Sequence, residues 1–183
     1  MKGTVYYIMQ DSKGVLWIAT KGDGLVRAEP IASNGLSYRL SRYRYDEDDM
    51  YSLSNDNVYC VYEDHHGRIW AATFAGGINY ISQGEHGETV FINHRNNLKG
   101  YPIDVCYKAR FITSDNNGRL WVGTTTGAVA FDENFKKQLS LAKKIMASKT
   151  TEQDIADFFA LSEDAVSAET KESTMKTEGN HHV

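Results

Sequence analysis

Three stretches of ten residues repeat one pattern along the chain: Asp11–Thr20, Asp64–Thr73 and Asp115–Thr124. In each stretch an Asp is followed, at the same offsets, by a Gly, a Trp and a Thr, and the tryptophans lie 53 and then 51 residues apart. A period of about 50 residues is typical of architectures in which each copy forms one structural unit. The recurring residues are Asp11, Gly14, Trp17, Thr20, Asp64, Gly67, Trp70, Thr73, Asp115, Gly118, Trp121 and Thr124.

Each copy has the pattern of a β-hairpin. An apolar run precedes the Asp-x-x-Gly turn, in which the Asp side chain accepts hydrogen bonds from turn amides and the Gly adopts a positive φ. The apolar segment around the Trp then suits a strand that is buried on both faces. A third strand follows the next glycine, and segments such as 38–45 and 90–94 supply a fourth. We therefore predict an all-β fold, an incomplete β-propeller of about three four-stranded blades.

The repeated residues are interpreted as structural. A binding site would mark one copy, whereas a packing role marks every copy of a repeat. We therefore expect Trp17, Trp70 and Trp121 to fill the space between blades. Cys60 occupies an apolar strand position of the repeat and is predicted to be a buried free thiol, while Cys106 lies outside the matched repeat.

The region from Val5 to Phe135 resembles a known family, the two-component regulator propeller repeat. The resemblance rests on Val-Tyr-x-Ile-x-x-Asp-x-x-Gly-x-Leu-Trp-Ile-x-Thr at the first copy and on two lead-in segments, Tyr51–Tyr59 and Arg110–Asp115. Such repeats build the periplasmic sensor region of hybrid two-component systems in Bacteroides-type bacteria. Those proteins have propellers outside the inner membrane, then a β-sandwich, a transmembrane helix and a histidine kinase, and they detect oligosaccharides.

The resemblance implies a function for this chain in signal transduction. We expect a carbohydrate-sensing propeller fragment that is not an enzyme, because the chain has few repeats and no kinase region. The alternative is a protein-interaction scaffold without a small ligand. A propeller lyase or hydrolase is conceivable by fold analogy alone, but no acid, base or metal set supports it.

Composition excludes several other classes. A formal charge of −4 argues against a nucleic-acid partner. No apolar run is long enough to span a membrane, and no signal peptide is written at the amino terminus. The resemblance implies a periplasmic location, whereas the sequence as written implies a cytoplasmic one. We expect no cofactor, metal or catalytic residue: His65 and His66 make a poor chelate in a turn, and Asp46–Asp49 lacks the spacing of a calcium loop.

Composition changes after residue 135. We predict a propeller domain over residues 1–135 and a helical or disordered tail over residues 136–183. Leu139, Ala142, Ile145 and Met146 recur at helical spacing. Two interpretations of the tail stay open: an appendage that covers a blade edge or contacts a partner, and the product of a truncated gene.

One segment is a candidate ligand site. Residues 38–45 alternate aromatic and cationic side chains, which suit stacking on sugar rings and hydrogen bonding to hydroxyls or carboxylates. The plainer interpretation is an edge strand whose charges resist edge-to-edge pairing. The candidate ligand-binding residues are Arg39, Arg42, Tyr43, Arg44 and Tyr45.

Three blades are too few to close a propeller ring, for which four is the usual minimum. The first and third blades should each have an open, partly apolar flank. We therefore expect the chain either to self-associate through these flanks or to cover one of them with the region around Leu139 to Leu161.

Overall fold

A computed structural model describes residues 3–31, 37–98, 100–131 and 138–139 of the chain. The chain divides into two units, Met1–Lys143 and Lys144–Val183, and every described residue belongs to the first. The predicted tail therefore lies almost wholly outside the described residues. Its one described part, Gln138–Leu139, is a strand, so the helical periodicity that included Leu139 was misleading at that residue.

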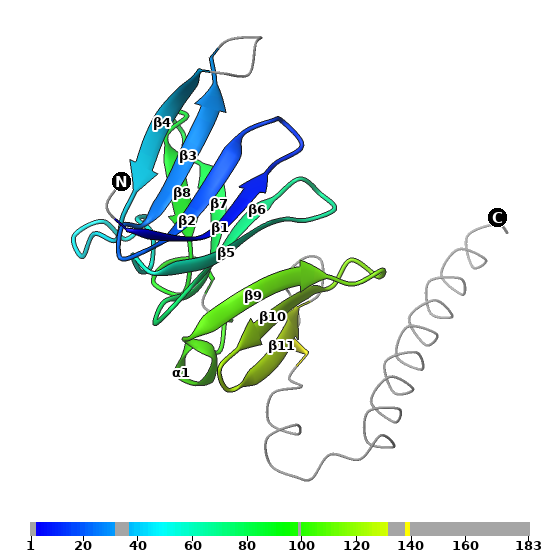
Figure 1. The fold of residues 1–183 in the computed structure, drawn as a ribbon. Coiled ribbons are helices and arrows are strands. Elements are labelled where there is room, and N and C mark those ends of the chain that lie inside the picture. Colours follow the sequence, from blue (N-terminus) through cyan, green and yellow to red (C-terminus); the bar gives the residue numbers. More distant parts are fainter. Residues whose placement is uncertain (1–2, 32–36, 99, 132–137, 140–183) are drawn as a thin grey trace, which may run out of the picture. The chain divides into compact units, whose positions relative to one another are not determined.

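In the described residues, twelve strands form three antiparallel sheets of four strands each (Figure 1). The first sheet has the order β1-β2-β3-β4, the second β5-β6-β7-β8 and the third β12-β11-β10-β9. The predicted all-β, three-bladed propeller fold is confirmed.

The strands of the first sheet are β1 (Thr4–Gln10), β2 (Leu16–Lys21), β3 (Leu25–Pro30) and β4 (Tyr38–Tyr43). Those of the second are β5 (Val58–Glu63), β6 (Ile69–Thr73), β7 (Gly77–Gln83) and β8 (Thr89–Ile92). Those of the third are β9 (Ala109–Ser114), β10 (Leu120–Thr124), β11 (Gly127–Phe131) and β12 (Gln138–Leu139).

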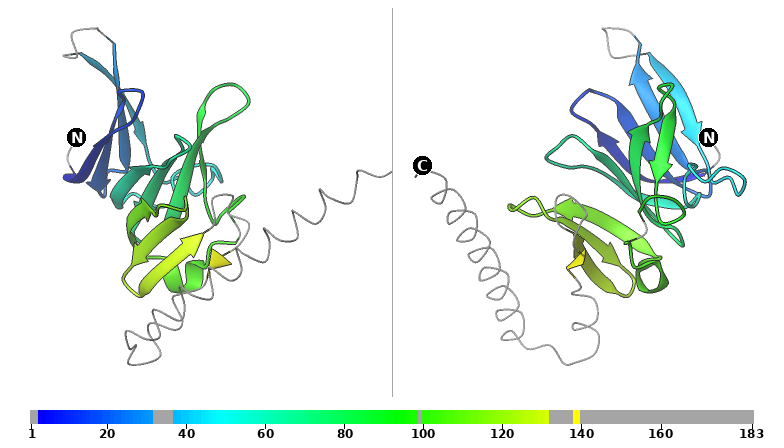
Figure 2. Two further views of the ribbon diagram at one scale, coloured as in Figure 1. Left: turned by 90° about the vertical axis from the view of Figure 1, so that its right-hand side faces the viewer. Right: turned by 180° about the vertical axis from the view of Figure 1, so that it is seen from behind.

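A short helix, α1 (Ile103–Cys106), connects the second blade to the third. Within the described part of the chain, no helix has the length and apolar character needed to cross a membrane. The three blades follow one another in chain order, and the first strands of neighbouring blades touch, β1 with β5 and β5 with β9 (Figure 2).

The core consists of two apolar clusters, one on each face of the middle blade. In β6, Ile69 and Ala71 pack toward the first blade, whereas Trp70 and Ala72 pack toward the third. All five residues of β6 are buried, because side chains alternate across a strand and both faces of this sheet are covered. The first cluster contains Val15, Trp17, Ala19, Leu25, Leu53, Val58, Val61, Ile69, Ala71 and Phe91.

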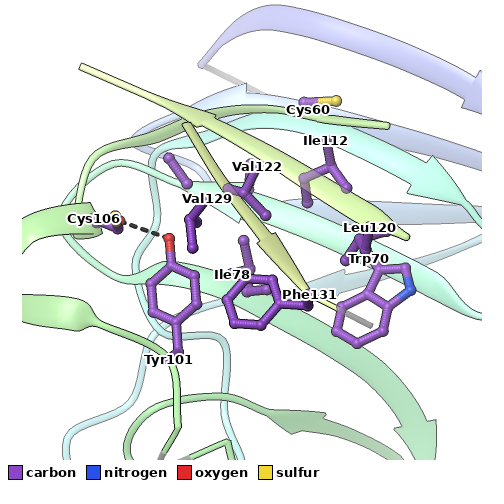
Figure 3. Close-up of a cluster of buried hydrophobic side chains, with 12 residues drawn as sticks. Cys60, Trp70, Ile78, Tyr101, Cys106, Ile112, Leu120, Val122, Val129 and Phe131 are labelled. Atoms are coloured by element: carbon purple, nitrogen blue, oxygen red, sulfur yellow. Dashed lines mark hydrogen bonds between the residues drawn. The ribbon is translucent and has the colours of Figure 1, made fainter. Parts of the chain in front are cut away.

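Figure 3 shows the second cluster, between the second and third blades. Ile112, Leu120 and Val122 of the third blade pack against residues of the second blade such as Trp70. Beside them Tyr101 donates its hydroxyl hydrogen to the carbonyl oxygen of Cys106 at 2.7 Å. The loop before α1 therefore closes one side of this cluster.

The repeated Asp is a hydrogen-bond centre in every blade. In the second blade, one carboxylate oxygen of Asp64 accepts from the amides of His66 and Arg68 at 2.9 and 3.0 Å. The other accepts from the indole nitrogen of Trp70 at 2.9 Å. The same indole bond joins Trp17 to Asp11 at 2.9 Å and Trp121 to Asp115 at 2.8 Å.

The remaining repeat residues also have one task each. Gly14, Gly67 and Gly118 adopt φ values of 81°, 71° and 77°, as the turn requires. The hydroxyls of Thr20, Thr73 and Thr124 donate to the carbonyl oxygens of Gly24, Gly77 and Gly127 at 2.7, 3.0 and 2.8 Å. The motif therefore stabilises two successive turns of each blade.

Candidate functional site

The structure brings four of the five candidate ligand residues to one cleft. β4 is an edge strand of the first sheet, and Arg44 and Tyr45 follow it directly. The cleft has a volume of about 320 Å³. Arg39 does not line it, because its side chain is 70% exposed and lies 3.8 Å from Glu29 instead. The cleft is lined by Arg42, Tyr43, Arg44, Tyr45, Asp46, Asp49, Tyr51, Ser52, Thr89 and Phe91.

Both arginines of the cleft have carboxylate partners. Arg42 lies 3.3 Å from Asp23, and Arg44 lies 2.9 Å from Asp56. The hydrogen bond and the charge of Asp56 raise the pKa of Arg44. Asp56 also accepts from the amide of Tyr45 at 2.7 Å, so it holds the chain where β4 ends. The carboxylates of Asp23 and Asp56 therefore balance the charges of the two arginines. A small anion that offers only its charge would gain little in this cleft.

The aromatic residues of the cleft fall into two kinds. Tyr43 is fixed, because its hydroxyl shares a hydrogen bond with Thr89 at 2.9 Å and its ring meets Phe91 edge-on at 5.3 Å. Tyr45 and Tyr51 are 44% and 45% exposed. Exposed tyrosine rings can contact the apolar face of a sugar while their hydroxyls bond to its polar groups.

Sequence reasoning did not assign Tyr51, Ser52, Thr89 and Phe91 to this site, and it missed Arg95, which lies beside the cleft. Its guanidinium lies 4.9 Å from the ring centre of Tyr45. Three hydrogen bonds of 2.9 to 3.1 Å hold it to the carbonyls of Asp46 and Glu47 and to the hydroxyl of Ser52. Arg95 is 50 residues from Tyr45 in the chain and belongs to no repeated motif, so no local pattern could have placed it there.

A second, larger cleft of about 470 Å³ lies between the first and second blades. Its lining includes Lys13, Arg27, Arg68 and the rings of Trp17 and Tyr80. Arg27 is paired with a glutamate at 3.1 Å, and Arg68 with an aspartate at 2.6 Å. These groups come from the repeated turns and their adjoining strands. This cleft is therefore the space that remains where two neighbouring blades pack together.

Buried nucleophiles in the described chain are poorly suited to catalysis. Cys60 and Cys106 are both buried free thiols, which confirms the prediction for Cys60. Burial raises the pKa of each thiol, and a thiol that stays protonated is a weak nucleophile. Among the described residues no group of three or more His, Cys, Asp or Glu could hold a metal ion.

Comparison with known families identifies the repeats. The family model described as two component regulator propeller matches residues 2–22 and 52–75. The first two blades carry two-component regulator propeller repeats. The matched residues cover β1 and β2 of the first blade, and β5 and β6 of the second with the segment that leads into β5. The third blade repeats the same Asp, Gly, Trp and Thr. None of the curated proteins matches the chain significantly.

Several solved structures resemble these propeller repeats. Two are from B. thetaiotaomicron and are assigned to the extracellular domains of the hybrid two component systems BT4673 and BT3049. They are 18% and 20% identical, cover 81% and 75% of this chain, and have TM-scores of 0.39 and 0.45. A third is PorZ, a surface component of the type-IX secretion system of Porphyromonas gingivalis, with 13% identity, 75% coverage and a TM-score of 0.51. The chain covers only 26%, 23% and 21% of these three structures, and the likeness to PorZ concerns the fold alone.

Proposed function

We propose that this chain is a ligand-recognising propeller segment of a two-component sensor, placed in the periplasm and without catalytic activity of its own. The family match supports the sensor assignment. The bonding of the repeat supports a role other than catalysis, because its Asp, Trp and Thr side chains are engaged in turns and inter-blade packing. The sequence places the end of the propeller region at residue 135, but β12 pairs with β11 beyond that point, so we propose residues 1–143 as the propeller region and residues 144–183 as a separate tail.

The ligand that the cleft at the end of β4 suits best is an oligosaccharide. The observation that carries this proposal is the pair of half-exposed tyrosines, Tyr45 and Tyr51, in one cleft with two charge-paired arginines. A volume of about 320 Å³ lies at the small end of the range for ligand sites, which is about 300–1,000 Å³. The cleft therefore has room for a short part of a sugar chain.

Calorimetric titration of the purified chain with a panel of neutral and acidic oligosaccharides tests this proposal. Tyr45→Ala should weaken binding of the best ligand about ten-fold, which is about 1.4 kcal/mol. Tyr38→Ala is the matched control, since Tyr38 lies at the start of β4, is 37% exposed and does not line the cleft. Absence of binding throughout the panel, or equal weakening by both variants, would overturn the assignment of the ligand to this cleft.

One observation favours the alternative of a protein-interaction scaffold. Ile8, Leu40 and Phe111 are 58%, 66% and 54% exposed on the first and third blades. Exposed large apolar side chains mark a protein-binding surface where they lie together in one patch. Two results together would replace the sensor function by the scaffold function. Leu40→Lys would abolish binding of a purified partner domain, and none of the oligosaccharides in the panel would bind to the chain.

A further inference from the structure

The first strand of every blade contains a β-bulge at the same position of the repeat. Its pairing with the second strand shifts between Val5 and Tyr7 in the first blade and between Val58 and Cys60 in the second. In the third blade it shifts between Ala109 and Phe111. One residue in each blade is thereby left out of the ladder. These three bulge residues are Tyr6, Tyr59 and Arg110.

The bulges bring three side chains from distant parts of the sequence into one row. The rings of Tyr6 and Tyr59 are stacked, with centres 4.7 Å apart and planes inclined by 23°. The guanidinium of Arg110 lies 4.3 Å from the centre of the Tyr59 ring. A bulge redirects the side chain it carries, and bulges are frequent beside functional sites. Because β1, β5 and β9 are neighbours, identical bulges place their side chains side by side.

Three further residues extend this row beside the third blade. Phe74 forms an isolated bridge with Lys108, whose ammonium lies 5.1 Å from the ring centre of Phe74 and 5.1 Å from that of Tyr107. Arg110 also lies 5.3 Å from the Phe74 ring. We refer to Tyr6, Tyr59, Phe74, Tyr107, Lys108 and Arg110 together as the bulge platform.

Packing alone does not account for the bulge platform. Tyr6 and Tyr107 are 37% and 36% exposed and Arg110 is exposed, whereas the inter-blade Trp17 and Trp70 are buried. The packing residues of the repeat keep their type in every copy, but the bulge residue is Tyr, Tyr and then Arg. A packing residue of a repeat keeps its type in every copy and is buried, whereas a binding residue differs between copies and faces solvent. The bulge residues fit the second description.

The two cations of the platform have no carboxylate partner within the described part of the chain. Lys108 and Arg110 contact only aromatic rings through their charged ends, unlike Arg42 and Arg44 in the cleft at the end of β4. A guanidinium without a carboxylate partner donates two parallel hydrogen bonds to a carboxylate or sulfate. The phenol hydroxyls and ring edges beside it suit the hydroxyls and carbons of a sugar ring.

We propose that the bulge platform is a second site, which binds an acidic sugar chain through Lys108 and Arg110. Carboxylate and sulfate groups share the required chemistry. The site has no residue in common with the cleft at the end of β4 and does not depend on it. The overall charge of −4 disfavours unspecific attraction of polyanions, so binding of an acidic sugar reports a local site.

Titration of the full chain with three tetrasaccharides tests the platform: an oligogalacturonate, a heparin-derived sulfated chain and neutral maltotetraose. At least one acidic chain should bind ten-fold or more tightly than maltotetraose, and its affinity should fall as salt rises. Which of the two binds identifies the anionic group. Arg110→Gln should weaken this binding about ten-fold. Arg39→Gln is the matched control, because it removes an exposed charge outside both sites.

Tyr45→Ala separates this site from the proposed oligosaccharide cleft. If the platform is correct, Tyr45→Ala leaves the affinity for the acidic chain unchanged, whether or not the cleft binds any ligand. Failure of both acidic chains to bind would overturn the proposal that the bulge platform is a binding site. So would equal weakening by Arg110→Gln and Arg39→Gln, since that result indicates attraction to overall charge.

Discussion

At the scale of single residues, the repeat is a small hydrogen-bond network built around an aspartate. The sequence predicted that the Asp would accept from turn amides. It did not predict the indole bond, because a spacing of six residues has no meaning until the hairpin is folded. In the second and third blades an arginine adds a further bond, since Arg68 and Arg119 donate to Asp64 and Asp115 at 2.6 and 2.8 Å.

The tryptophans should differ in their contribution to stability. Trp70 is buried between two blades, whereas Trp121 is only half-buried because it faces away from the second blade. Trp70→Ala should lower the free energy of unfolding by about 3–5 kcal/mol, and Trp121→Ala by clearly less. Urea denaturation followed by circular dichroism measures both. Equal losses would contradict the placement of Trp121 at an uncovered face.

Acid should destabilise the fold in two steps. Burial lowers the pKa of His94 from its usual 6.5. Burial alone would raise the pKa of Asp64 and Asp115, but hydrogen bonds from tryptophan, arginine and turn amides more than offset it, so both pKa values lie below 3.8. In each case the unfolded chain binds more protons than the folded chain, so stability rises with pH.

The first loss should therefore appear as pH falls below about 6.5, and the second as it falls below about 4. Urea midpoints measured from pH 8 to pH 3 test both steps. His94→Gln should remove the dependence on the His94 proton, whereas His86→Gln, on an exposed turn, should keep it. A fold that becomes more stable between pH 7 and pH 5 would contradict this account.

At the scale of elements, the sequence predicted the strands and hairpins, but it predicted neither the β-bulges nor the short strand β12. Alternating apolar residues and Asp-x-x-Gly turns located the first three strands of each blade, and residues 38–45 and 90–94 located β4 and β8. The bulges were not foreseen, because a bulge shifts the alternation by one residue and this shift is hidden where apolar and aromatic residues are consecutive, as in Val5–Met9 and Val58–Tyr62. β12 was missed because a strand of two residues has no pattern and Leu139 also fitted a helical period.

Two glycines of one turn should respond differently to substitution. Gly22 and Gly24 have almost equal φ values of 77° and 78°. An added Cβ at Gly24 would lie 2.1 Å from the carbonyl oxygen of Tyr43, whereas none of the surrounding atoms lies within 4 Å at Gly22.

Gly22→Ala should therefore cost only the strain of a positive φ, about 1–2 kcal/mol. Gly24→Ala should cost about 1–3 kcal/mol more, because β4 must move away. Thermal unfolding of the two variants measures the difference, and similar transition temperatures would show that β4 does not pack against this turn.

At the scale of the whole molecule, a residue's surroundings depend on which blade carries it. Tyr7, Cys60 and Phe111 occupy one repeat position, yet Cys60 is buried while Tyr7 and Phe111 are 39% and 54% exposed. Phe111 projects from the face of the third blade that lies away from the second. The sequence could align these residues, but it could not assign their burial without the order of the blades.

The exposed apolar residues of the outer blades predict self-association. Light scattering behind size-exclusion chromatography should give a mass that rises with protein concentration, and the double substitution Leu40→Lys with Phe111→Lys should reduce that rise. A monomeric mass at every concentration would contradict open flanks. In that case, deletion of residues 144–183 would show whether the tail covers one of them.

The fold rests on one arrangement, in which three repeats stack in chain order and the middle blade is covered on both faces. Hydrogen exchange of the central strands β2, β6 and β10 tests it directly, because each is paired on both sides within its own sheet and they differ in how their faces are covered. Amide exchange should be slowest in β6 and faster in both β2 and β10. Exchange in β2 or β10 as slow as in β6, or no protected amides in any of the three strands, would contradict it.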